Sequence, residues 1–474
     1  MSAAPTTRTV KIDRSQLPVP GPTRPFPFPA IEKSTLPNGL RVWTVHHAQV
    51  PLVAFTLLVR RGAASDPAGK DGLAAVTADM LDEGSGERSA IEMHEALARL
   101  GAQFDTDIGS DATVANVTVL SRFAQRALQL LSDIVARPAL RESDFARVRQ
   151  LRLHRLTQLR DVPGAVADRT FVQLLYAEHP YGHTPMGSEK ALAALTIDDV
   201  RRFHAQGIRP DAATLVAVGD CDHAQIERIA ADVFAGWEGS GGREGALRPP
   251  LDSGHTTPRD VAEQSGARLF IVPRAGAPQS ELRIGHVAVA RNTPDYHALV
   301  AANMILGGQF VSRINLNLRE DKGFTYGART AFDFRRMPGP FSLQASVQTA
   351  ATARAIEESL GEIAAIRGPR PVSGEELALG VAALTRGYAR SFETPEQIAR
   401  AATQIALYDL PDDYFVNFVP EVERVTTSDV TRATAEHLDP TRLITLIVGD
   451  LDAVGRDLPT LGLGDPVVLS ADTF

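Results

Sequence analysis

Apolar residues follow strand and helix periodicities in turn along this chain. After Asn38 and Gly39, a pair typical of a tight turn, the alternating run "LRVWTV" predicts a strand, and "LVAFTLLVRRG" predicts a second one. The segment "ERSAIEMHEALARLGAQ" has helical spacing between a capping box, Ser89 and Glu92, and a C-terminal glycine, Gly101. Strand and helix patterns keep alternating downstream, so we predict helices packed on a sheet.

One stretch of this pattern occurs twice. The 28 residues that start at Leu195 and the 28 that start at Val425 align without a gap and are identical at ten positions. Each copy reads as a capped helix, a turn, an apolar strand and an acidic turn, and the copies lie on either side of a glycine- and proline-rich segment. This arrangement indicates a tandem duplication. We therefore predict an α+β fold of two homologous halves, each a mixed sheet covered by helices.

Composition sets the expected boundaries. Residues 1–33 are rich in proline, which favours an extended chain, and predict an arm on a surface or a free tail. Residues 238–265 are rich in glycine, proline, serine and charge, without apolar periodicity, and predict a linker. The two halves are then residues 34–237 and 266–474.

Charge and hydropathy exclude several classes of protein. The 474 residues include 57 acidic and 49 basic ones, a formal net charge of −8, whereas nucleic-acid binding needs a basic face. The single cysteine, Cys221, can form neither an internal disulfide nor a sulfur-ligated metal site. No apolar run reaches the roughly 20 residues that cross a bilayer, so we predict no membrane span and a soluble protein of bacterial type. The start "MSAAPTT" resembles a mature end after a removed signal, which favours the periplasm over the cytoplasm.

Candidate chemistry lies in the second half. The twelve histidines form neither H-E-x-x-H nor H-x-x-E-H. The segment "NMILGGQFVSRINLNLREDKGFTYGART" predicts a helix that Gly307 and Gly308 interrupt, that runs to about residue 320 and that Gly323 ends, followed by a strand. Arg319 then lies at a helix C-terminus and Tyr326 early in the strand. Their donors suit a polarised carbonyl or its oxyanion, although both placements are also common for structural reasons.

With these features the chain resembles the pitrilysin or insulinase family of zinc peptidases, from about residue 34 to about residue 454. The shared landmarks are "LPNGLRV", "GAASDPAGKDGLA", "HPYG", "VGD" and "LGGQFVSRINLNLRE", and "LREDKGFTY" matches the family pattern L-R-E-x-x-G-x-x-Y. The resemblance implies that the two halves face each other as a clamshell. It also implies that Arg319 and Tyr326 assist at a zinc site, and we assign Gly307 and Gly308 to substrate binding.

The zinc helix departs from the family pattern. "GLAAVTADML" places Ala75 and Asp79 on the two histidine positions of G-L-A-H-x-x-E-H-M and Ala78 on the catalytic glutamate. The last ligand position falls at Arg155. Catalytic zinc needs about three protein ligands and a base for its water. We therefore predict that this chain has no zinc or other cofactor and is inactive alone.

The resemblance then implies a non-zinc subunit of a heteromeric zinc metalloendopeptidase. A homologous zinc-bearing partner would complete a heterodimer, and Arg319 and Tyr326 would act on peptide substrates at the partner's zinc. The alternative is a structural or peptide-binding subunit with no proteolytic role, like the core subunits of respiratory complexes. Binding of presequences is a third alternative and the least favoured of the three. It would need a long glycine-rich loop, and this chain has only "LGGQF" at that place. The arginine row over 147–160 is typical of a solvated helix face, with binding of acidic peptides as the alternative.

Overall fold

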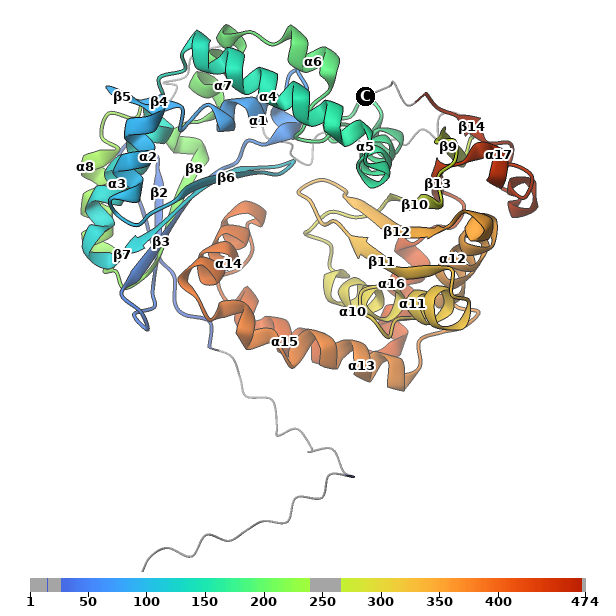
Figure 1. Ribbon diagram of the computed structural model, residues 1–474. Helices are drawn as coiled ribbons and strands as arrows, with labels where there is room; N and C mark the ends of the chain where they lie inside the picture. The colour runs from blue at the N-terminus through green and yellow to red at the C-terminus, as the bar shows by residue number, and fades with distance from the viewer. Residues whose placement is uncertain (1–14, 16–26, 239–265, 471–474) are drawn as a thin grey trace, which may run out of the picture.

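The computed structural model describes residues 15, 27–238 and 266–470, which form two lobes (Figure 1). Each lobe has a six-stranded sheet with helices packed on it, so the predicted α+β fold of two similar halves is confirmed. The predicted linker, apart from its first residue, and most of the predicted N-terminal arm lie outside the described residues. No helix in the described ranges is long and apolar enough to cross a membrane.

The first lobe is built on a mixed sheet. Its strand order is β1-β2-β8-β3-β7-β6, with β2 and β8 parallel and the other neighbours antiparallel. The strands are β1 (Glu32–Thr35), β2 (Arg41–His46), β3 (Leu52–Val59), β6 (Phe104–Ile108), β7 (Thr113–Leu120) and β8 (Ala213–Gly219), and a separate small hairpin is formed by β4 (Gly84–Ser85) and β5 (Arg88–Ser89). The helices are α1 (Leu73–Asp79), α2 (Ala90–Ala98), α3 (Ala124–Ala136), α4 (Glu142–Arg160), α5 (Pro163–Tyr176), α6 (Glu189–Ala194), α7 (Ile197–Gly207) and α8 (His223–Val233).

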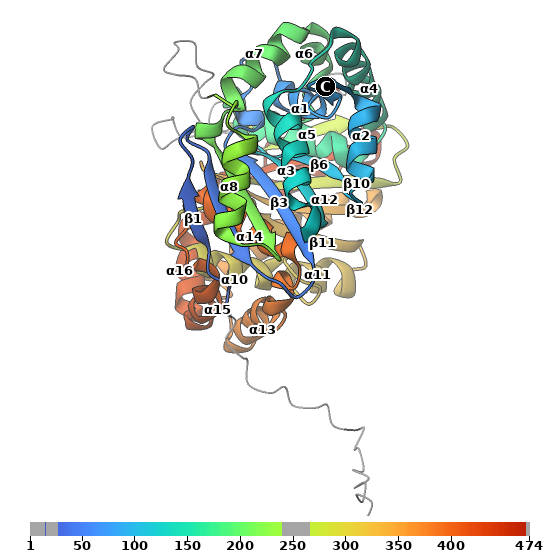
Figure 2. The ribbon, with the colours of Figure 1, turned by 90° about the vertical axis from the view of Figure 1, so that its left-hand side faces the viewer.

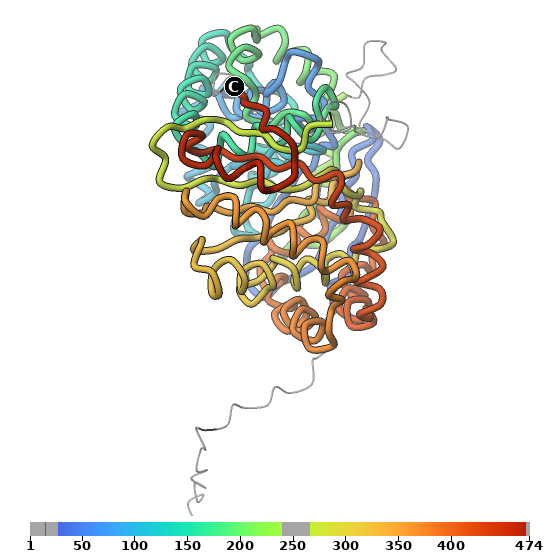
Figure 3. Tube along the Cα trace, turned by 90° about the vertical axis from the view of Figure 1, so that its right-hand side faces the viewer, coloured from blue at the N-terminus to red at the C-terminus, as the bar shows by residue number. Residues whose placement is uncertain are grey.

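The second lobe repeats this plan. Its strand order is β11-β12-β10-β13-β9-β14, and β9 is parallel to both of its neighbours; β14, near the C-terminus, runs beside β9 (Figure 3). The strands are β9 (Leu269–Pro273), β10 (Gln279–Val287), β11 (Thr325–Phe332), β12 (Pro340–Gln348), β13 (Ile444–Gly449) and β14 (Val467–Val468). The helices are α10 (Tyr296–Leu306), α11 (Arg313–Asn315), α12 (Thr352–Ile366), α13 (Gly374–Thr385), α14 (Pro395–Tyr408), α15 (Tyr414–Arg424), α16 (Thr427–His437) and α17 (Leu451–Val454).

The sequence repeat corresponds to equivalent elements of the two lobes. Thr196 and Asp199 form a capping box at the start of α7, and Thr426 and Asp429 form the same box at the start of α16. The strand that follows each helix is fully buried and lies third from one edge of its sheet: β8 is third from β1, and β13 is third from β14. The edge strand β6 of the first lobe therefore corresponds to the edge strand β11 of the second.

One helix of each lobe packs on the sheet of the other lobe. Helix α14 of the second lobe packs on β3 and β8, and Ile398 shares a buried cluster with Val216 (Figures 1 and 2). Phe28, from the end of the predicted arm, is buried in the same cluster. Helix α5 of the first lobe packs on β10 and β13, where Phe171 shares a cluster with Leu446. Because close-packed cores resist rearrangement, the lobes form one unit.

The turns beyond the two edge strands also meet. Asp111, in the turn between β6 and β7, accepts a hydrogen bond from the Tyr181 hydroxyl at 2.5 Å and another from the backbone N–H of Arg336 at 2.9 Å. The Tyr176 hydroxyl donates to the carbonyl of Pro338 at 2.9 Å. Arg336 and Pro338 lie between β11 and β12, so the bond from Arg336 to Asp111 joins the tips of the two edge hairpins, and Tyr176 and Tyr181, at and after the end of α5, each hold one of these tips.

Candidate functional site

Helix α1, the predicted remnant of a zinc helix, is held in place by a buried carboxylate. Asp66 accepts hydrogen bonds from the N–H groups of Gly72 and Ala74, both at 2.7 Å, which satisfies donors at the helix start. Nε2 of His183 lies 3.1 Å from Oδ2 of Asp66. Burial raises the pKa of Asp66; the pKa of His183 is also raised, because the contact with Asp66 outweighs the effect of burial. Local polar contacts thus support α1 without a metal.

The side chains at the zinc-ligand positions of α1 leave no free ligand set. Ala75 and Ala78 are buried and present methyl groups. Oδ2 of Asp79 accepts a hydrogen bond from Nε of Arg152, on α4, at 2.6 Å. Arg155 is exposed and lines the same 610 Å³ cavity as Asp79 and Arg152. A guanidinium therefore already neutralises the carboxylate.

This donor set does not fit catalytic zinc. Such a site needs about three protein ligands, and here one carboxylate is paired with a cation that would repel the metal ion. Sequence reasoning placed the last ligand position at Arg155, whereas the side chain that reaches Asp79 is Arg152. Arg152 and Arg155 are three residues apart and share a helix face. The sequence therefore also allowed Arg152 as the arginine that contacts Asp79.

The remaining arginines of α4 make local contacts. Arg147 pairs with Glu83, Arg149 donates to the carbonyl of Leu195 at 2.9 Å, and Arg160 pairs with a glutamate of α6. The cavity beside Arg152 also carries acidic side chains, namely Asp79, Asp82, Glu83 and Asp105. The arginine row therefore does not form a purely cationic surface.

In the second lobe, the segment predicted as one interrupted helix forms two helices, α10 and α11, separated by a loop. Helix α10 ends before Gly307, a loop follows, and α11 continues into a π-helical turn, Leu316–Asp321. A Cβ at Gly307 would lie 2.6 Å from Thr330 Oγ1, and a Cβ at Gly308 would lie 2.9 Å from the carbonyl of Asn303. Gly307 thus lets the loop pack against β11 and Gly308 lets it pack against the end of α10, while their role in substrate binding stays a prediction. Gly323 has a φ of +65° after the turn, as predicted.

Arg319 projects from the π-helical turn. Its guanidinium carbon lies 4.3 Å from the centre of the Phe310 ring, and its Nε lies 3.3 Å from the carboxylate of Glu320. The side chain is 37% exposed and Phe310 is 56% exposed. A π-helical turn alters side-chain directions relative to an α-helix and often occurs at functional sites. Sequence reasoning did not single out Phe310, although it stands in the quoted "LGGQF".

Tyr326 projects from a second irregular feature. The pairing of β11 with β12 shifts register between Thr325 and Ala328, so Tyr326 lies in a β-bulge, and it is 89% exposed. The N–H of Gly327 donates to Thr325 Oγ1 at 3.1 Å, which stabilises the bulge. Bulges re-aim side chains at sheet edges. In the described part of the chain no hydrogen bond joins Arg319 to Tyr326, so both have donors available to another molecule.

The two predicted sites lie in different lobes. In both Figure 1 and Figure 2, α1 lies at the top of the first lobe and α11, which leads into the turn with Arg319, lies low in the second. The described contacts of Arg319 are all with residues of its own segment. None of these contacts joins Arg319 to the α1 helix of its own chain.

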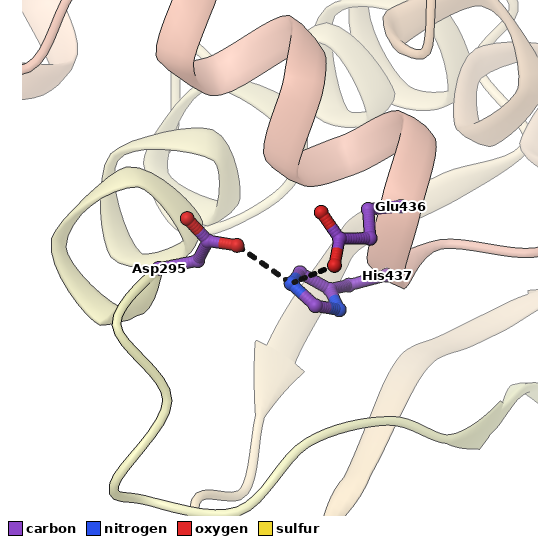
Figure 4. A group of neighbouring side chains, drawn as sticks. All are labelled: Asp295, Glu436 and His437. Atoms are coloured by element: carbon purple, nitrogen blue, oxygen red, sulfur yellow. Dashed lines mark hydrogen bonds and ion pairs between the residues drawn. The ribbon is translucent and has the colours of Figure 1, made fainter.

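One other group of side chains in the described ranges has the spacing of metal ligands: Asp295, Glu436 and His437 (Figure 4). Nε2 of His437 lies 2.8 Å from Oδ2 of Asp295, and Arg432 donates to both oxygens of Asp295, at 3.1 Å for Oδ2. The hydrogen bond from Arg432 lowers the pKa of Asp295. Because this carboxylate is already fully engaged, we interpret the group as an ion-pair cluster that joins α10 to α16.

Comparisons with known sequences identify the family. Residues 41–188 match the family profile described as Insulinase (Peptidase family M16), and residues 194–384 match the profile described as Peptidase M16 inactive domain. The chain belongs to the M16 peptidase family. It is 24% identical over 298 residues to the uncharacterized zinc protease SCO5738 of Streptomyces coelicolor, covering 62% of this chain and 63% of that protein. It is 23% identical over 296 residues to the uncharacterized zinc protease YmxG of Bacillus subtilis, covering 62% and 68%.

Solved structures share the fold. A peptidase M16 inactive domain protein from Pseudomonas fluorescens superposes with a TM-score of 0.80 at 24% identity, covering 89% of this chain and 98% of that one. A protease from Helicobacter pylori superposes with a TM-score of 0.81 at 20% identity, covering 89% and 99%. At these identities the likeness establishes the two-lobed architecture.

Proposed function

We propose that this chain is the non-zinc subunit of a heteromeric zinc metalloendopeptidase. The observation that carries the proposal is the contrast between the two sites. Arg152 pairs with the one carboxylate at the degenerate zinc position, whereas on the other lobe Tyr326 is 89% exposed and the Arg319 side chain is 37% exposed. A homologous partner would supply the zinc ion, its water and the general base.

In such a complex, Arg319 and Tyr326 bind the peptide and stabilise its reacting carbonyl. Zinc held by the partner would supply the Lewis acid that activates water. The guanidinium of Arg319 is a permanent cation with several donors, and the Tyr326 hydroxyl adds one more. Both can donate to the carbonyl oxygen as negative charge develops on it, and one such donor contributes about 3 kcal/mol. Phe310 limits the directions that Arg319 can adopt and thereby reduces the entropy lost when the substrate binds.

An extended peptide has a place to bind at the edge strand β6. Cavities of 610 Å³ and 1180 Å³ lie along this strand, and both are lined by Asp105 and Thr106. The larger one runs between the sheet and α14, where Glu396 and Arg400 line it. Peptides commonly add to an exposed sheet edge through main-chain hydrogen bonds. This arrangement supports peptides, rather than small molecules, as substrates.

The resemblance implied a clamshell between the two halves of this chain, but the cores that the lobes share favour a chamber that forms between two chains. Closure within one chain would disturb the α14 and α5 contacts and the bonds of Asp111, whereas association of two rigid chains disturbs neither. We therefore place the substrate chamber between this chain and its partner. The periplasm remains our preferred compartment.

The test is to isolate the chain from its source and identify what accompanies it. We expect a homologous chain with an intact H-x-x-E-H, one zinc ion per heterodimer, and hydrolysis of fluorescein-labelled casein by the complex but not by this chain alone. A stable complex that lacks zinc and does not cleave casein would instead support the structural role.

A further inference from the structure

Asn315 lies between the two irregular features that carry Arg319 and Tyr326. It is the last residue of α11, and the π-helical turn with Arg319 begins directly after it. Asn315 is 8% exposed, so its amide is shielded from water and must find hydrogen-bond partners within the protein.

The amino group of this amide holds the loop in front of α11. Nδ2 of Asn315 donates to the carbonyl of Gln309 at 3.1 Å and lies 3.3 Å from Oγ of Ser312. Gln309 directly precedes Phe310, the ring that lies against the guanidinium of Arg319. Asn315 thereby fixes the backbone that carries the stacking partner of Arg319.

The carbonyl group of the same amide holds the bulge. Oδ1 of Asn315 accepts a hydrogen bond from the N–H of Ala328 at 2.9 Å. Ala328 is the residue at which pairing with β12 resumes after the register shift, so this bond fixes the far end of the bulge that projects Tyr326. Only an amide of this length supplies donors on one side and an acceptor on the other: aspartate lacks the donors and leucine lacks both.

We propose that Asn315 is a positioning residue that sets Arg319 and Tyr326 at the separation needed to reach one carbonyl oxygen. This inference rests on the proposed function of the pair. Asn315 itself does not touch the substrate. It acts by joining the loop of Phe310, the π-helical turn and the bulge into one rigid piece. Rigidity matters here because misplacement of a catalytic group by about 1 Å can cost about 100-fold in rate.

A double-mutant cycle in the purified heteromeric complex separates this role from a merely structural one. Asn315→Asp should lower kcat/KM for labelled casein by about 10- to 100-fold, mostly through kcat. In an Arg319→Ala background the same change should cost less than about threefold, because it removes the donor that holds the loop of Phe310 and therefore acts through Arg319. Additive losses, or wild-type activity of Asn315→Asp, would overturn the proposal. Thr330→Val, which removes a nearby bond to Asn303, is the matched control and should stay near wild type.

A second measurement does not depend on activity. In Asn315→Leu, amide hydrogen exchange at Ala328 should be at least about tenfold faster than in the wild-type chain, since the acceptor is gone. Unchanged exchange there would overturn the proposal even if activity fell. If Tyr326→Phe lowers activity but Asn315→Asp does not, only the positioning role fails. If Arg319→Ala and Tyr326→Phe are both fully active, the proposed function fails and the positioning role fails with it.

Discussion

Nε of Arg152 donates to Oδ2 of Asp79 at 2.6 Å, and this ion pair joins α4 to α1 where a catalytic metal would need free ligands. The pair is partly buried, with the Arg152 side chain 14% exposed. It gives the degenerate helix a structural role of its own.

Restoring histidines to α1 should not restore strong zinc binding while Arg152 is present. In Ala75→His/Asp79→His, the two imidazoles lie at positions i and i+4 of the helix. The guanidinium of Arg152 would then lie beside them without its partner carboxylate, Asp79. Adding Arg152→Met should tighten zinc binding at least about tenfold, since the repelling charge is removed. Equilibrium dialysis with metal analysis measures this, and Arg155→Met in the same background is the control, with a smaller effect. Equal affinities with and without Arg152 would contradict the account.

The exchanged helices predict one cooperative unfolding transition for both lobes. Ile398 of α14 is fully buried against the first lobe's sheet, and Ile398→Ala should destabilise the chain by about 2–5 kcal/mol. Ile91→Ala, at a 72% exposed position, is the same substitution without burial and should change stability by less than about 0.5 kcal/mol. Calorimetry should show a single transition in all three proteins. Two separate transitions in Ile398→Ala would show that the lobes fold independently.

The segment that carries Arg319 should lose support in acid. The hydrogen bond from Arg313, on α11, lowers the pKa of Glu376 to about 2. A carboxylate with a lowered folded-state pKa adds stability above its unfolded value, and that stability is lost as the pH falls toward the folded value. Glu376→Gln should therefore lower the melting temperature at pH 7, and the difference from wild type should shrink between about pH 4.5 and pH 2. Exposed Glu375→Gln is the control and should show no such pH dependence.

Much of the architecture was predictable because local and long-range signals agree in this sequence. The capping box at Ser89 and the two repeat copies, each read as a capped helix, predicted helices that the structure confirms, and it places capping boxes at Thr196 and Thr426. The packing of α14 and α5 on the sheet of the opposite lobe was not predictable from the sequence, because an apolar helix face can cover either sheet.

At the candidate site, too, the sequence predicted local elements but not the side-chain contacts that depend on tertiary packing. Spacing predicted that Arg319 and Tyr326 follow one another across a helix end and a strand start. It could not predict the π-helical turn or the bulge, because neither has a sequence signal of its own, and contacts such as those of Asn315 with Gln309 and Ala328 are set by the packed structure. Similarly, the erased ligands at α1 were visible in the sequence, whereas the partner of Asp79 depended on how α4 packs.

The most direct test of the central claim is the kinetics of Arg319→Ala and Tyr326→Phe in the complex with the zinc-bearing partner. We predict that each lowers kcat/KM for labelled casein by about 100-fold or more, as loss of an oxyanion donor does. Zinc content and subunit association should be unchanged, and Arg329→Ala, an exposed arginine on the same strand, should be near wild type. Full activity of both variants in an intact, zinc-loaded complex would contradict the account.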